Sequence, residues 1–218
     1  GARPTELAAY RREELSGDAL ALADEAGAER FHLVGHDWGG VLAWDIAQRA
    51  PERVTSLTVL STPHPTALGH ALKTPDQVKK SWYIGMFQIP AAPERLLAGR
   101  VGTLTRRAGI PEEAAERYGR RFATADDLRG PINWYRAMLR KDGVTGKNAG
   151  NGIITMPTTF VWGNRDPALG RTAAEETEVY VHAPYEFIEL DAGHWLPERE
   201  APAVAEAIVD RISSVTSD

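Results

Sequence analysis

The stretch Val34-Gly35-His36-Asp37-Trp38-Gly39-Gly40 decides the fold of this chain. It joins an apolar run at residues 31–34 to a helical pattern at residues 41–47. A Gly-x-nucleophile-x-Gly sequence between a strand and a helix predicts a nucleophile elbow, a sharp turn that exposes the central side chain. Small residues are expected on both sides of Asp37, because the turn leaves no room for a Cβ atom and needs unusual backbone angles.

The central residue of this elbow is Asp37 rather than a serine. Attack by serine on a saturated carbon gives an inert ether, whereas attack by a carboxylate gives an ester that water can cleave. An Asp nucleophile therefore predicts displacement at saturated carbon, as in epoxide opening or dehalogenation. A helix N-cap is the structural alternative for Asp37, but capping alone does not explain the flanking glycines.

Composition limits the class of protein. The chain has 218 residues, 43% of them hydrophobic, which fits one domain with room for an inserted subdomain. Its net charge is −5 and no basic tract stands alone, which argues against nucleic-acid and membrane-surface partners. The chain has no Cys, which excludes disulfides and thiol chemistry but does not indicate a compartment. With no membrane-length apolar run and no signal peptide, we expect a soluble, cytoplasmic protein, although a processed N-terminus would look the same. No feature indicates an oligomeric state.

Strand and helix patterns alternate at the two ends of the chain, and a helical region separates them. An alternating pattern with an all-helical insert predicts an α/β fold, in which helices cover both faces of a parallel sheet and the insert forms a lid. We expect core segments at 1–63 and 152–218 and the lid at 64–151, with a glycine-rich return linker at Gly143–Gly152. The predicted strands are 31–34, 54–60, 158–162 and 185–190, and the predicted helices outside the lid are 5–27, 41–50, 172–181 and 201–212.

Asp37, Asp166 and His194 each follow directly after a predicted strand. Reactive groups collect at the carboxyl ends of parallel strands, so these three form a candidate catalytic constellation. His194 would not activate Asp37, which is already ionised at neutral pH, but would take a proton from the water that cleaves the ester. Asp166 would orient the imidazole, with an Asx-turn as its structural alternative. Asp191 is nearer to His194 in sequence, but too near to fold back onto it.

Four motifs together resemble α/β-hydrolase-fold epoxide hydrolases. They are His-Asp-Trp-Gly-Gly at 36–40, Ser-Thr-Pro-His-Pro at 61–65, Trp-Gly-Asn-Arg-Asp at 162–166 and Ala-Gly-His-Trp at 192–195. The resemblance covers nearly the whole chain and implies the α/β-hydrolase fold. His-Asp-Trp-Gly is shared with haloalkane dehalogenases, so a dehalogenase with the same Asp nucleophile is the alternative activity.

The lid separates these two activities. Segments Trp82–Gln88 and Pro131–Arg136 resemble the family segments that supply two tyrosines to the epoxide oxygen. The resemblance therefore implies that Tyr83 and Tyr135 donate protons as the ring opens. The structural alternative is a pair of amphipathic lid-core tyrosines. In a dehalogenase, the Trp before each tyrosine would instead bind the halide.

Further lining residues follow from the same resemblance. Trp38 is expected to place its backbone N–H in the oxyanion hole and its ring against the substrate, or to pack beneath the lid. We expect His36 to support or pack rather than act as a base, and Gln88 and His64 are weaker lining candidates. The implied substrate is a small apolar epoxide, with no metal and no organic cofactor.

The family pattern continues upstream of this sequence. Family members begin with about four more strands and a His-Gly-x-Pro loop that supplies another oxyanion-hole N–H, and no His-Gly-x-Pro occurs in these 218 residues. We therefore expect a partial sequence that lacks the N-terminal half of the sheet and leaves an unpaired apolar edge on the nucleophile strand. The alternative is a complete chain that serves as a non-catalytic binding protein built on a hydrolase remnant.

Overall fold

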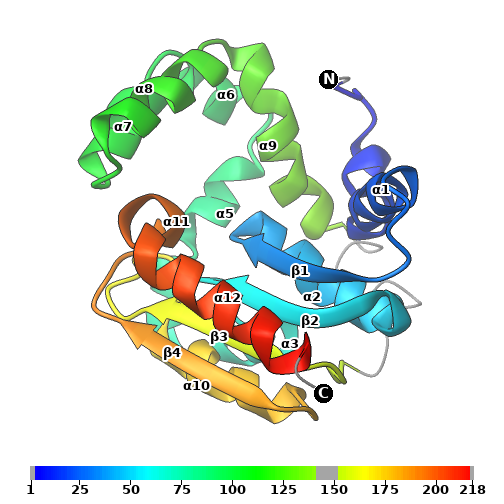
Figure 1. The fold of residues 1–218 in the computed structure, drawn as a ribbon. Helices are drawn as coiled ribbons and strands as arrows, with labels where there is room; N and C mark the ends of the chain where they lie inside the picture. Colours follow the sequence, from blue (N-terminus) through cyan, green and yellow to red (C-terminus); the bar gives the residue numbers. More distant parts are fainter. Residues whose placement is uncertain (1–2, 141–151, 217–218) are drawn as a thin grey trace. The chain divides into compact units, whose positions relative to one another are not determined.

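A computed structural model describes residues 3–140 and 152–216 (Figure 1). The chain forms two compact units, one of residues 15–81 and 147–218 and the other of residues 1–14 and 82–146. All four strands of the described residues lie in the first unit, and the second is helical. The predicted linker Gly143–Gly152 lies outside the described residues, apart from its last glycine.

The first unit is built on a parallel sheet with the strand order β1-β2-β3-β4. The predicted strands are confirmed, two of them with identical bounds. Register places His36 opposite Leu60, and Leu60 opposite Val161, so the strands end close to one edge. This edge is where the candidate residues follow the strands. The strands are β1 (Phe31–His36), β2 (Val54–Leu60), β3 (Thr158–Gly163) and β4 (Tyr185–Leu190).

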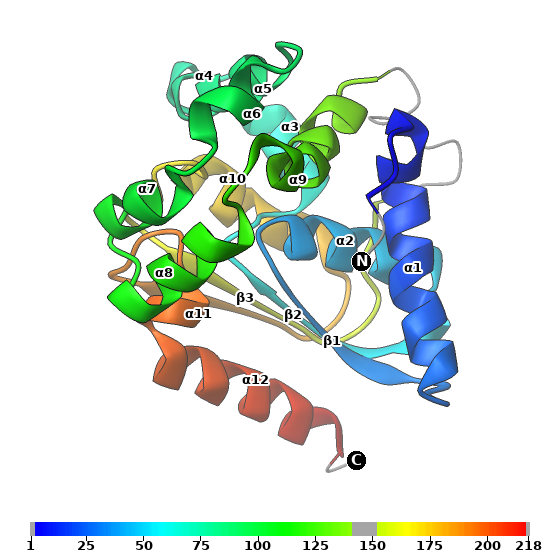
Figure 2. The ribbon, with the colours of Figure 1, turned by 90° about the horizontal axis from the view of Figure 1, so that it is seen from above.

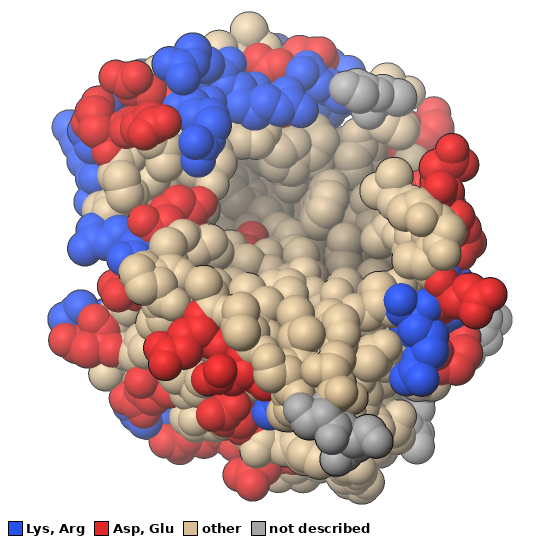
Figure 3. All heavy atoms as spheres, viewed as in Figure 1, with Lys and Arg blue, Asp and Glu red and all other residues tan. Residues whose placement is uncertain are grey.

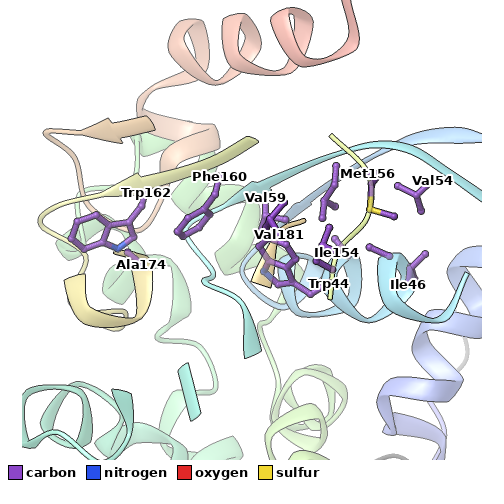
Figure 4. Close-up of a cluster of buried hydrophobic side chains, with 13 residues drawn as sticks. Trp44, Ile46, Val54, Val59, Ile154, Met156, Phe160, Trp162, Ala174 and Val181 are labelled. Atoms are coloured by element: carbon purple, nitrogen blue, oxygen red, sulfur yellow. The ribbon is translucent and has the colours of Figure 1, made fainter. Parts of the chain in front are cut away.

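Helices cover both faces of this sheet, as predicted (Figure 2). Successive residues of β3 point to opposite faces of the sheet. Phe160 packs in a hydrophobic cluster that includes residues of α2, and Val161 packs in a second cluster that includes residues of α12. Figure 4 shows the first cluster, in which Trp44 of α2 lies among Val59 and Ile154. The helices of this unit are α2 (Trp38–Arg49), η2 (Pro51–Arg53), α3 (Pro65–Ala71), α4 (Pro75–Lys80), α10 (Arg171–Glu176), η3 (Thr177–Tyr180), α11 (Leu196–Arg199) and α12 (Ala201–Thr216).

The N-terminal helix expected at 5–27 is interrupted. A 3₁₀-helix, η1 (Leu7–Tyr10), is followed by extended backbone at Arg11 and then by α1 (Arg12–Glu25). The interruption has a packing cause, because Tyr10 is buried in the helical unit and its hydroxyl donates to the carbonyl of Pro4. The stop predicted at Gly27 is present, with a positive φ of 70°.

The described residues of the helical unit form five α-helices besides η1 and the first residues of α1. Prolines lie at the start of two of them: Pro93 is in the first turn of α6, and Pro111 is the N-cap of α8, where no helical hydrogen bond is lost. Pro131, a residue type that ordinarily ends a helix, instead lies inside α9, which continues to Met138. Its neighbours Leu128 and Ile132 are buried, so packing outweighs the lost backbone hydrogen bond. The helices are α5 (Trp82–Phe87), α6 (Ala92–Leu97), α7 (Val101–Arg107), α8 (Glu112–Arg121) and α9 (Ala125–Met138).

The predicted lid of residues 64–151 and the compact helical unit have different limits. Helices α3 and α4 fall within residues 15–81, the unit that contains the sheet. They do so because α3 packs against α10. The functional division at 1–63, 64–151 and 152–218 stays a prediction.

Charged side chains of both signs occur on the face of the molecule shown in Figure 3. Among residues 3–140 and 152–216, no helix combines the length and the apolar character needed to cross a membrane.

Candidate active site

The turn between β1 and α2 has the backbone of a nucleophile elbow. Asp37 has φ 53° and ψ −119°, a combination that residues with a Cβ atom rarely adopt. Its side chain makes no capping hydrogen bond to the helix that begins at Trp38. Asp37 therefore does not act as a side-chain N-cap of this helix, and its carboxylate can bind other partners.

Close packing explains only part of the glycine pattern around Asp37. A Cβ on Gly35 would lie 2.3 Å from the carbonyl oxygen of Gly39, and a Cβ on Gly40 would lie 3.0 Å from the Thr62 side chain. A Cβ on Gly39 would meet nothing within 4 Å outside its own stretch of helix. The expectation that a Cβ would not fit on either side of Asp37 is thus correct at Gly35 and wrong at Gly39. On the C-terminal side the crowded position is Gly40, one residue after Gly39.

The three candidate residues meet at the carboxyl edge of the sheet. His194 Nε2 lies 3.0 Å from Asp37 Oδ1, although the two residues are 157 positions apart. His194 Nδ1 lies 2.7 Å from Asp166 Oδ2. The imidazole therefore bridges two carboxylates, one at the elbow and one in the loop after β3.

Asp166 serves both of the roles weighed for it. One carboxylate oxygen, Oδ1, accepts the backbone N–H groups of Ala168 and Leu169 at 2.7 and 3.0 Å, which is an Asx-type turn. The other oxygen, Oδ2, faces His194, and the side chain is fully buried. Asp191, the nearer carboxylate in sequence, pairs with Arg165 at the surface instead.

The two carboxylates control the charge of His194. Burial disfavours the imidazolium, but hydrogen bonds to Asp166 and Asp37, and the charges of both, outweigh it and raise the pKa of His194 to about 10. For Asp37, burial is likewise opposed, by His194 and by the backbone N–H of Trp38, and its pKa is lowered. At neutral pH the site is an imidazolium between two carboxylates.

The backbone of His194 is held from the neighbouring strands. Its carbonyl oxygen accepts from His36 Nε2 at 2.9 Å and from Ser61 Oγ at 2.8 Å. Burial, together with the nearby positive charge of His194, lowers the pKa of His36, so its ring is neutral and donates through Nε2. His36 lies where a supporting role was expected. Ser61 was not expected, although its position directly after β2 and its φ of 67° mark it.

His64 lies in the interior rather than on a surface that a ligand could reach. Its exposed fraction is 0%, and its ring stacks on Tyr180 with centroids 4.5 Å apart. Nδ1 accepts from the backbone N–H of Thr66, and burial lowers the pKa of His64 to about 4. A neutral histidine of this kind fits a structural role better than the lining role considered for it.

Within the helical unit, the two candidate tyrosines lie together. The ring centroids of Tyr83 in α5 and Tyr135 in α9 are 5.8 Å apart, in a T-shaped arrangement. Phe87 contacts both rings. Gln88 Nε2 donates to the backbone carbonyls of Ile84 and Tyr135, so the side chain considered as a lining residue joins the two tyrosine-bearing segments.

Comparison with known proteins agrees with the fold and with the sequence motifs. The sequence pattern of the α/β hydrolase fold matches residues 2–201. The chain belongs to the α/β hydrolase fold family. Epoxide hydrolase A of Mycobacterium tuberculosis is 30% identical over 98% of this chain, and YfhM of Bacillus subtilis, an AB hydrolase superfamily protein, is 32% identical over 95% of it.

Solved structures of family members show the same likeness. Epoxide hydrolase A from Mycobacterium thermoresistibile has 28% identity and a TM-score of 0.80, with 97% of this chain and 78% of that one covered. The present α/β hydrolase chain spans 78% of the M. tuberculosis protein, 74% of YfhM and 59% of epoxide hydrolase 3 from Xenopus tropicalis, to which it is 32% identical. These relatives confirm the resemblance read from the sequence motifs.

An ion pair in the helical unit of this α/β hydrolase holds the tyrosine-bearing helices in place. Arg136, next to Tyr135, donates to the carbonyls of Phe87 and Ile89, at the end of α5. The same guanidinium is hydrogen-bonded to both carboxylate oxygens of Glu94, whose side chain is 9% exposed. This pair leaves no signal in the sequence, because nothing in local spacing links an arginine with a carboxylate 42 residues away.

Proposed function

We propose that this protein hydrolyses an epoxide to a vicinal diol through a covalent ester on Asp37. The observation that carries the proposal is the hydrogen-bonded chain from Asp37 through His194 to Asp166, at 3.0 and 2.7 Å. A carboxylate nucleophile with a histidine beside it suits a reaction that forms an ester and then cleaves it with water. The similarity to epoxide hydrolase A and epoxide hydrolase 3 supports an epoxide as the substrate.

In the first half-reaction, an oxygen of Asp37 attacks an epoxide carbon, and the ring C–O bond breaks. The ring oxygen takes a proton as it leaves. We assign this proton to Tyr83 and Tyr135, carried by the proposed lid of residues 64–151, because a phenol with a pKa of about 10 can donate without being ionised beforehand. Their 5.8 Å ring separation within the helical unit supports a shared role on one oxygen.

Ester formation prepares the site for the second half-reaction. It removes the negative charge of Asp37, and His194 then keeps only one of the two carboxylates that raise its pKa. The imidazolium releases a proton, and the phenolate left by the tyrosine that protonated the ring oxygen takes one up from solvent, so the protons balance. Neutral His194, oriented by Asp166, becomes the base that activates water.

Water then cleaves the ester. The water oxygen adds to the carbonyl carbon of Asp37 while His194 takes one of its two protons. The bond between that carbon and the diol oxygen then breaks, and the diol oxygen takes the second water proton, which leaves Asp37 as a carboxylate. We assign stabilisation of the developing oxyanion to the Trp38 N–H, which already helps to lower the pKa of the Asp37 carboxylate. Each turnover consumes one water and restores the carboxylate and the imidazolium.

A haloalkane dehalogenase would use the same nucleophile and differ at the leaving group. A halide needs no proton, and its usual partners are indole N–H groups in a desolvated pocket. Trp82, one of the two candidate halide donors, is 67% exposed. This exposure favours the epoxide.

The decisive experiment is a single turnover in ¹⁸O-water with full-length enzyme in excess over an aryl epoxide. Peptide mass spectrometry should find the label in the peptide that contains Asp37, with the Asp166 peptide as the unlabelled internal control. Label found only in the diol would exclude the ester. A parallel assay with a chloroalkane separates the activities, since halide release at a rate similar to diol formation would support the dehalogenase.

A further inference from the structure

The loop that carries Asp166 is held from one side by α4 (Pro75–Lys80). Gln77 in this helix is only 1% exposed. Its Oε1 accepts the backbone N–H of Gly170 at 2.9 Å, and its Nε2 donates to the carbonyl of Ala168 at 2.8 Å. Buried amides with such partners are costly to remove, because the backbone groups they serve are left unpaired. Gln77 therefore ties α4 to the loop at two points.

Lys80 binds the same loop at Asp166 itself. Its Nζ donates to the backbone carbonyl oxygen of Asp166 at 2.7 Å, a charge-assisted hydrogen bond. Helix and loop are also in direct contact, since a Cβ on Gly170 would lie 2.9 Å from Asp76 Oδ2 and 3.8 Å from Lys80 Cδ. The main chain of the acid is thus held by a residue of α4.

The sheet and hydrogen bonds within the loop also hold it in place. Trp162 Nε1 in β3 donates to the carbonyl of Leu169 at 3.2 Å. The Asp166 side chain accepts two N–H groups of the same loop, so its own orientation depends on where the loop lies. Movement of the loop would displace Oδ2 from His194 Nδ1, and a displacement of 1 Å in a catalytic group can cost about 10²-fold in rate.

We propose that Gln77 and Lys80 are positioning residues for ester hydrolysis, holding the loop at residues 166–170 so that the Asp166 carboxylate faces His194. The inference rests on the proposed function. Both side chains act on Asp166 rather than on the nucleophile, so they serve the second half-reaction and not the first.

The test compares four substitutions in the full-length protein. Lys80→Met removes the donor and keeps the aliphatic stem, Lys80→Arg keeps a donor, and Gln77→Leu removes both loop hydrogen bonds. Lys79→Met is the matched control, because Lys79 is exposed on the same turn of α4. Lys80 is only half-buried, so Lys80→Met keeps the test informative if Gln77→Leu fails to fold.

Rapid-quench mass spectrometry of the Asp37 peptide measures ester formation and ester hydrolysis separately. For Lys80→Met we expect hydrolysis to slow about tenfold and formation to change less than about twofold, so that ester accumulates. Lys80→Arg should recover most of the loss, and Lys79→Met should match wild type. Equal slowing of both steps would instead indicate a general structural defect and overturn the inference.

A second readout needs no turnover. NMR titration of the substrate-free protein follows the His194 ring, which is faced by Asp37, Asp166 and His36. We expect the pKa of His194 to fall by about one unit in Lys80→Met, as its bond to Asp166 weakens, and to stay at the wild-type value in Lys79→Met. An unchanged titration in Lys80→Met would overturn the inference. If wild type forms no ester, the proposed function fails, while the titration still decides whether α4 positions Asp166.

Discussion

The substitution Asp166→Asn isolates the effect of one charge on the site. Asparagine has nearly the same shape, and its Oδ1 can still accept the N–H groups of Ala168 and Leu169, which preserves the loop. Its Nδ2 then replaces the oxygen that lies 2.7 Å from His194 Nδ1. Because an amide nitrogen donates, the imidazole must offer an unprotonated Nδ1. The ring proton moves to Nε2, the atom that faces Asp37.

The expected effect falls on one chemical step. A neutral His194 with its proton on Nε2 has no free nitrogen to take a proton from water. The same change in a Ser-His-Asp triad lowers kcat about 10⁴-fold through the wrong tautomer. We therefore expect ester hydrolysis to slow by about 10³- to 10⁴-fold, which is about 4 to 5.5 kcal/mol in activation free energy. Ester formation needs only an ionised Asp37 and should change by less than about tenfold.

The assay mixes Asp166→Asn with an excess of epoxide and follows the modified Asp37 peptide by mass spectrometry over time. The ester should accumulate to nearly one per enzyme molecule and decay slowly. NMR titration of the free variant should show the pKa of His194 falling from about 10, because one of its two carboxylate partners is gone.

Asp191→Asn is the matched control. Asp191 is the carboxylate nearest to His194 in sequence, but it pairs with Arg165 at the surface. This variant should keep wild-type rates for both steps. Ester hydrolysis by Asp166→Asn within tenfold of the wild-type rate would contradict this role of Asp166, as would equally slow hydrolysis by Asp191→Asn.

Three further predictions concern the two tyrosines, His194 and the Arg136–Glu94 ion pair of the helical unit. Tyr83→Phe and Tyr135→Phe should each slow ester formation about 10²-fold or more and leave hydrolysis of a preformed ester nearly unchanged, as stopped-flow and quench kinetics can measure. Because folding raises the pKa of His194 from 6.5 to about 10, protonation of His194 stabilises the folded state. This contribution is fully present below pH 6.5 and is lost as the pH rises through about 10. Urea unfolding should therefore show wild type losing up to about 5 kcal/mol more than His194→Gln over this range. Arg136→Met leaves a buried carboxylate unpaired and should lower the free energy of unfolding by roughly 3 kcal/mol, whereas Arg106→Met, at a solvent-exposed ion pair, should leave the free energy of unfolding nearly unchanged.

Much of the sheet unit was readable from local patterns. The strands Val54–Leu60 and Tyr185–Leu190 have the bounds that β-branched and apolar runs predict. Such patterns work because a strand buried on a sheet needs apolar side chains at every position or at alternate ones, whatever lies elsewhere in the chain. The elbow could be predicted for the same reason, because Gly35 is required by close contact with the backbone of Gly39, only four residues away.

Local rules failed where distant packing overrides them. Pro131 lies inside α9 instead of ending it, because the helix is held by buried side chains on both sides of the proline. His64 was a candidate to line the site, but is enclosed against Tyr180, a residue more than a hundred positions away. Neither outcome follows from the residues nearby in sequence.

The sequence by itself determined the strands, the elbow with Asp37 at its centre, and the order in which Asp166 and His194 follow later strands. Only the tertiary structure decided how closely His194 approaches Asp37 and Asp166, and that Ser61, Gln77 and Lys80 hydrogen-bond the backbone of the loops that carry His194 and Asp166. The physical reason is the distance along the sequence over which each kind of interaction acts. Backbone sterics and burial act over a few residues and leave a local pattern, whereas a contact across 157 residues depends on strand register and packing of the whole sheet.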